Sequence, residues 1–135
     1  MSWNEFLSLT FTAGAVGGFV NALSIWFFGL RGINQFLGVD LKPKLTPQFV
    51  YPKITWGGIW GLLFILTIGH LPIFVSAILV SIPPTLVQIF YVFPKGGKGT
   101  GGVLLGTLTP MLVIFYNLIW SLAAALWIRL SLLPT

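Results

Sequence analysis

The sequence predicts an all-α polytopic integral membrane protein, a bundle of four transmembrane helices in which the third and fourth are kinked. The first observation is composition: of 135 residues, 56% are hydrophobic and only 7% are charged, whereas about 25% of the residues of a soluble domain are charged. The second is four apolar stretches of membrane-spanning length. The third is that the basic residues cluster in two connections. We expect a single membrane domain, residues 1–135.

Each apolar stretch is long enough to cross a bilayer. The predicted spans are residues 6–30, 54–71, 73–93 and 103–130. At 1.5 Å per residue they measure roughly 27 to 42 Å, against a hydrocarbon core of about 30 Å, so the last must tilt or protrude. Residues 69–72 join the second and third spans in a tight turn, because glycine ends helices and proline suits the first turn of the next one.

Charge orients the predicted bundle. Four spans place the connections at residues 31–53 and 94–102 on the same side of the membrane, and these connections hold Arg31, Lys42, Lys44, Lys53, Lys95 and Lys98. Only Arg129 lies on the side of the termini. Because short cytoplasmic connections are rich in Lys and Arg, we expect both connections in the cytoplasm and both termini in the periplasm or, in a thylakoid, the lumen.

The first connection contains three prolines, Pro43, Pro47 and Pro52. They exclude a continuous helix through it. Its start fits two structures. One is a short helix in the headgroup layer, with Ile33, Phe36 and Leu37 on one face and Asn34 and Gln35 pointing away; the other is an ordered loop packed on the bundle. The second connection, PKGGKGTGG, is too rich in glycine to be helical.

An internal repeat is one interpretation of the approaches to the second and fourth spans. Residues 48–61 and 88–106 share an order of Gln, Pro, Lys, Thr and Gly with slightly different spacing. Duplication would give two parallel helical hairpins. Coincidence is the other interpretation, because Gly and Pro are common in membrane helices.

Small and amide side chains should hold the bundle together, because lipid gives apolar helices no hydrophobic reason to associate. The predicted packing and polar-interior residues are Gly14, Gly18, Asn21, Gly57, Gly61, Gln88, Gly102, Gly106 and Asn117. Unpaired amides are costly in hydrocarbon. The three amide side chains should therefore point inward, either as interhelical hydrogen bonds or as part of a ligand site.

Proline should bend two of the spans. Pro83 and Pro84 lie at the middle of the third span and Pro110 lies in the fourth, and each removes an amide donor from its helix. Such bends mark substrate sites in transporters and also occur in bundles without transport. Tryptophans near the predicted span ends are expected to be interfacial anchors: Trp3, Trp56, Trp60 and Trp127.

Few residues can carry catalysis. The chain has no Cys, one His and two acids, and the predicted topology separates Glu5 from Asp40 across the membrane. Neither a Ser-His-acid triad nor a paired-carboxylate or metal site can be assembled, so we expect a protein that is not an enzyme. Scattered basic residues do not form the dense stripe that nucleic acid requires, so no nucleic-acid partner is expected.

The loop PKGGKGTGG has the glycine spacing of a dinucleotide-binding motif but follows a predicted helix, whereas that motif follows a strand. It is therefore either a flexible basic turn or an anion nest for a lipid phosphate or an acidic partner. The nest would consist of Lys95, Gly97, Lys98 and Gly99, with free amides at the start of the fourth helix.

Three glycine-rich segments carry a resemblance. TAGAVGGFV at residues 12–20, TWGGIWG at 55–61 and PKGGKGTGGVLLG at 94–106 resemble small uncharacterised bacterial inner-membrane proteins of the YagU-like kind, and the chain also resembles small multi-span proteins of cyanobacteria. The resemblance implies a bacterial inner membrane or a thylakoid membrane and assigns no chemistry.

Faces of small residues without reactive groups favour a non-enzymatic scaffold, either an accessory subunit of a larger membrane complex or a homo-oligomer. Its partners would be other subunits or itself, with anionic lipid headgroups at the cytoplasmic face. The prolines and inward amides favour, as an alternative, a carrier or pore for a small neutral or anionic solute. A second alternative is a lipid- or pigment-binding protein, in which His70 would ligate haem or chlorophyll; no cofactor is otherwise predicted.

Overall fold

Every long element of the structure is a helix. The computed structural model describes residues 2–132, and this part of the chain contains no strand. The long elements are α1 (Trp3–Leu30), α3 (Pro47–Gly61) with the 3-10 helix η1 (Leu62–Leu66), α4 (Ile73–Val87) with the π-helix η2 (Gln88–Val92) and α5 (Phe93–Lys95), and α6 (Thr109–Leu132). Two short elements, α2 (Ile33–Phe36) and η3 (Thr100–Gly102), lie in the connections.

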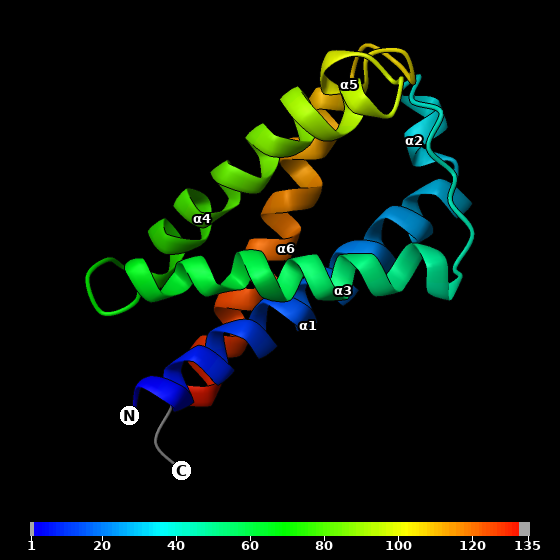
Figure 1. The fold of residues 1–135 in the computed structure, drawn as a ribbon. Helices are drawn as coiled ribbons and strands as arrows, with labels where there is room; N and C mark the ends of the chain where they lie inside the picture. The colour runs from blue at the N-terminus through cyan, green and yellow to red at the C-terminus, as the bar shows by residue number, and fades with distance from the viewer. Residues whose placement is uncertain (1, 133–135) are drawn as a thin grey trace.

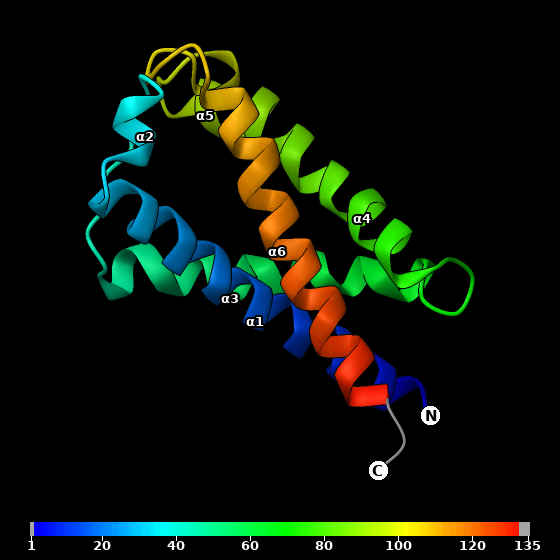
Figure 2. The same ribbon diagram turned by 180° about the vertical axis from the view of Figure 1, so that it is seen from behind.

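Four helical segments are long and apolar enough to cross a membrane: Trp3–Leu30, Pro47–Leu66, Ile73–Lys95 and Thr109–Leu132. This confirms the predicted all-helical fold with four helices of spanning length. The start of α1, the end of α6 and the turn between η1 and α4 lie at one end of the molecule, and the two long connections lie at the other (Figures 1 and 2).

The second of the four long apolar helices begins earlier than predicted. The Thr46 hydroxyl accepts a hydrogen bond from the Phe49 amide at 3.3 Å, and Pro47 occupies the first turn, where a missing N–H costs nothing. Pro52 lies inside the helix and removes a single backbone hydrogen bond without ending it. The expectation that the second span begins at residue 54, with residues 47–53 still in the connection, is therefore wrong.

The fourth of the long apolar helices begins later than predicted. Four glycines between residues 97 and 102 have positive φ values, which an α-helix does not allow, and α6 starts only at Thr109. Pro110 consequently lies in the first turn of α6. The expected kink at Pro110 is wrong, because this position needs no amide donor. Helix α4, by contrast, continues through Pro83 and Pro84 and widens into the π-helix η2.

The segments compared as a repeat have different structures. Residues 48–61 are helical throughout, whereas residues 88–106 pass from a π-helix through α5 into glycine turns and η3. A duplicated hairpin would place equivalent helices at equivalent positions. The structure therefore favours coincidence.

Helices α1 and α3 pack against each other backbone to backbone. A methyl group added to Gly14 would overlap the carbonyl oxygen of Gly57, and one added to Gly18 would overlap that of Lys53. A methyl group on Gly61 would press on the Cα of Gly14. Small residues allow this approach between apolar helices, so the predicted glycines of the first two spans lie in one shared contact.

Helix α6 packs on this pair through large side chains. Trp120 is 4% exposed, packs against Phe64 with ring centroids 6.5 Å apart, and donates from Nε1 to the Gly14 carbonyl oxygen at 3.0 Å. Ala124 and Ile128, further along α6, are fully buried. One core therefore joins α1, η1, α4 and α6.

A second buried cluster ties the first connection to α6. The Tyr116 hydroxyl donates to Asn34 Oδ1 at 2.6 Å, and Asn34 Nδ2 donates to the Leu41 carbonyl oxygen at 2.8 Å. These bonds hold helix α2 against the bundle, with Asn34 buried and Phe36 88% exposed. Of the two predicted structures, the headgroup-layer helix with Asn34 pointing away from the apolar face is wrong, because Asn34 is buried and bonded to Tyr116. The start of the connection packs on the bundle, as the other alternative proposed.

Candidate functional site

A cleft of about 480 Å³ lies between α3 and α4, with α1 and α6 forming its floor. Its walls consist of Pro52, Lys53, Trp56, Gly57 and Trp60 from α3, and of Pro84, Val87, Gln88, Tyr91 and Val92 from α4 and η2. The floor consists of Gly18, Asn21, Asn117 and Trp120. In Figure 1, α3 and α4 lie in front of α1 and α6, and Figure 2 shows the reverse.

The cleft exists because α3 and α4 pack on different partners. They are consecutive, and consecutive antiparallel helices commonly pack along their length. Here the glycines of α3 hold it on α1, while α4 packs on α6, so α3 and α4 diverge from the turn that joins them (Figure 1). Close backbone packing at one interface therefore leaves a gap at the next.

The cleft occupies the half of the bundle nearer the long connections. Its lining runs over residues 52–60 of α3 and residues 84–92 of α4 and η2, from near the middle of each long helical segment toward that end. At 1.5 Å per residue this is a length of about 12 Å. The cleft therefore extends from close to the basic connections to about the middle of the bundle.

The three predicted amides lie together at the cleft. Asn117 Nδ2 donates to Thr85 Oγ1 at 2.9 Å and to Gln88 Oε1 at 3.4 Å, and Asn21 Nδ2 donates to the Tyr116 carbonyl oxygen at 2.7 Å. Within the described residues, Gln88 Nε2 and the Oδ1 atoms of Asn21 and Asn117 have no protein partner. The amides therefore join helices and also offer a ligand both donors and acceptors.

Three cleft residues have roles that the sequence did not predict. Lys53, assigned to a loop, is the seventh residue of α3 and lines the cleft, with Nζ 5.1 Å from the centroid of the Phe49 ring. Trp56 and Trp60, predicted as anchors at a span end, lie in the middle of the segment Pro47–Leu66 and line the cleft. The Thr-Pro pair at residues 46 and 47 was the sequence signal for this earlier helix start.

The predicted anion nest is only partly available. Gly97 and Lys98 donate their amides to carbonyl oxygens of α5 at 3.1 and 2.9 Å, so these two amides are already bonded. Gly99 follows with a φ of 79°. Both lysine side chains are exposed, and Lys95 Nζ donates to the Tyr91 hydroxyl at 2.8 Å. This bond holds a cation at the rim of the cleft, because Tyr91 is one of the lining residues.

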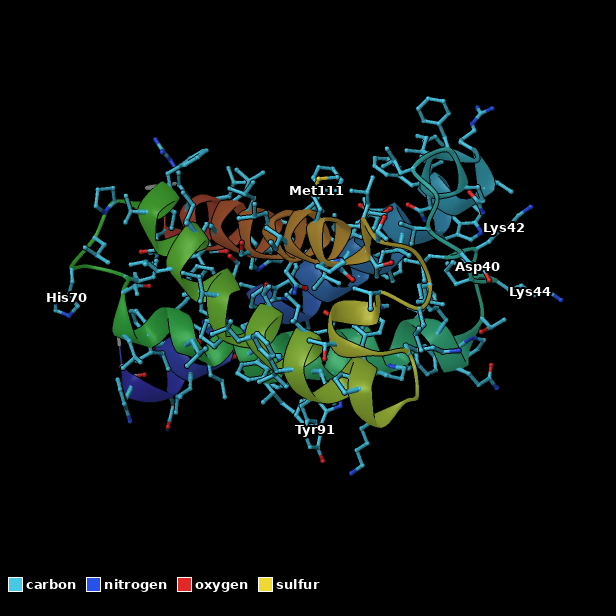
Figure 3. All side chains as sticks on the ribbon, turned by 90° about the horizontal axis from the view of Figure 1, so that it is seen from above. Asp40, Lys42, Lys44, His70, Tyr91 and Met111 are labelled. Carbon is cyan, nitrogen blue, oxygen red and sulfur yellow. The ribbon has the colours of Figure 1, made fainter. Side chains whose placement is uncertain are left out.

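The remaining predicted site residues lie away from the cleft. Gly102 and Gly106 belong to the connection before α6, where a methyl group on Gly106 would overlap the Gly38 carbonyl oxygen of the other connection. His70 is exposed in the turn at the opposite end of the molecule from Lys42 and Lys44 (Figure 3). Among residues 2–132 no three His, Cys, Asp or Glu side chains are placed to hold a metal ion.

No known family, no curated protein and no solved structure matches this chain. The cleft combines tryptophan rings, three amides and one lysine in a gap between apolar helices.

Proposed function

We propose that the protein is an integral membrane protein that binds an amphipathic molecule from the bilayer in the cleft between α3 and α4. The observation that carries this proposal is the cleft itself, whose lining comes from four helices of spanning length and is mainly apolar and aromatic with a few polar groups. Small-molecule sites in proteins commonly have this lining and a volume of about 300 to 1,000 Å³. Placed in a bilayer, a cleft between such helices lies at the depth of the lipid.

Two features favour ligand binding over a scaffold role. Gly14, Gly18, Gly57 and Gly61 are occupied by contacts within the chain, so they no longer argue for packing against a partner subunit. The amides at the cleft, in contrast, retain unused hydrogen-bonding groups in a setting where hydrocarbon offers none. A bound polar group would satisfy them.

Membrane insertion in the expected orientation has a direct test, because the chain contains no native cysteine. Single variants Lys44→Cys, Lys98→Cys and His70→Cys should react with a membrane-impermeant maleimide in sealed vesicles. We expect Lys44→Cys and Lys98→Cys to be labelled from the same side and His70→Cys from the other, since these positions lie at opposite ends of four spanning helices. Labelling of Lys44→Cys and Lys98→Cys from opposite sides would overturn the topology.

Filling the cleft tests ligand binding. Val87 lines the cleft, and Val87→Trp should lower lipid occupancy by about tenfold, equal to roughly 1.4 kcal/mol. Occupancy would be measured by native mass spectrometry of protein extracted in mild detergent and loaded with phosphatidylglycerol. Val75→Trp is the matched control, because Val75 is exposed on the same helix outside the cleft. Equal occupancy in both variants would show that lipid binds elsewhere and would refute the proposal.

A further inference from the structure

We infer that the ligand of this cleft is an anionic lipid whose headgroup pairs with Lys53. The inference rests on the proposed function, because it requires the cleft to hold a molecule from the bilayer. It adds the chemical class of that molecule and the residue that selects it.

In the part of the chain that the structure describes, Lys53 has no negatively charged protein group beside it in the cleft. Among the described residues Lys53 is the only charged side chain that lines the cleft, and neither Glu5 nor Asp40 reaches it. Its nearest protein partner is the face of the Phe49 ring at 5.1 Å. A cation within a spanning helix is costly unless it is paired, and the protein supplies no carboxylate here. An anionic ligand would supply the missing negative charge.

The position of Lys53 along α3 fits a lipid headgroup with an acyl chain below it. Lys53 lies roughly 9 Å along the helix axis from the start of α3, and lysine can extend its stem toward the polar interface. The cleft continues past it along Trp56 and Trp60 to about the middle of the bundle. A headgroup at Lys53 would therefore place an acyl chain against the tryptophan rings.

Polar groups at the rim of the cleft and inside it also favour an anionic headgroup. Lys95 is held beside the cleft by its hydrogen bond to the Tyr91 hydroxyl at 2.8 Å, which adds a second cation near the opening. Deeper in the cleft, Gln88 Nε2 has no protein partner in residues 2–132 and can donate to a phosphate or ester oxygen. An isolated phosphate would leave the aromatic part of the cleft unfilled, so the arrangement favours a lipid over a free anion.

The test compares two lipids with identical acyl chains, phosphatidylglycerol and phosphatidylcholine. Delipidated full-length protein in detergent would be titrated with each lipid in brominated form, and quenching of tryptophan fluorescence would report entry into the cleft. We expect wild type to prefer phosphatidylglycerol by about tenfold. Lys53→Gln should remove this preference while still binding phosphatidylcholine, and Lys53→Arg should keep it, because arginine retains the charge.

Lys44→Gln is the matched control, since Lys44 lies in the long connection outside the cleft. Equal affinity of wild type for the two lipids, or a preference that survives Lys53→Gln, would overturn the inference and leave the proposed function standing. Displacement of bound phosphatidylglycerol by millimolar inorganic phosphate would also overturn it, because the site would then recognise the anion alone. If neither lipid quenches the tryptophan fluorescence of wild type more than that of Val87→Trp, the proposed function is overturned as well.

Discussion

Replacing Gly57 with leucine is expected to lower the free energy of unfolding by about 3 kcal/mol or more. Added atoms at this position would meet the carbonyl oxygen of Gly14, the Cα of Gly18 and the indole of Trp120. Two of these three are backbone and cannot rotate away. The helices must separate to accept the side chain, so the contact that holds α1 on α3 is lost.

The effect of Gly57→Leu can be measured by following helix unfolding as sodium dodecyl sulfate is titrated into detergent-solubilised protein. Thr55→Leu is the matched control, because Thr55 is exposed on the same helix two residues away. We expect this control to change the unfolding free energy by about 0.5 kcal/mol or less. A Gly57→Leu protein as stable as the Thr55→Leu protein would show that α1 and α3 do not meet backbone to backbone.

Replacing Trp120 with alanine should cost about 3 to 5 kcal/mol. The indole is almost fully buried, packs against Phe64, and links α6 to α1 through its bond to the Gly14 carbonyl oxygen. Its removal leaves a cavity at the floor of the cleft. Trp127 lies on the same helix but is 41% exposed, so Trp127→Ala should cost clearly less in the same titration. Equal losses for the two variants would contradict the assigned core.

Composition and apolar run length were sufficient to predict an all-helical chain with four helices of spanning length, because these properties do not depend on how the helices pack. The helix ends depended on local geometry that hydropathy does not report. Residues 103–108 are largely apolar, and this concealed the turns before α6. Proline content likewise concealed the start of α3, since Pro47 is harmless in a first turn and Pro52 is tolerated within the helix.

The polar part of the candidate site could be anticipated in part. Asn21, Gln88 and Asn117 were predicted to face inward because amides are costly in lipid, and the structure brings them to one cleft. The cleft itself could not be predicted, because it exists only if α3 packs on α1 instead of on α4. Hydropathy does not report which helices pack together. Lys53 was assigned to a loop because the predicted second span began at residue 54, after it, whereas α3 begins at Pro47.

The hydrogen bonds around Tyr116 have a consequence for biosynthesis. Asn21 and Asn34 both rely on Tyr116, which lies 95 and 82 residues further along the chain. When the ribosome has delivered only α1 and α2, these polar groups have not yet met their partner. The first half of the protein is therefore an incomplete unit during translation, and the arrival of the last helix completes it.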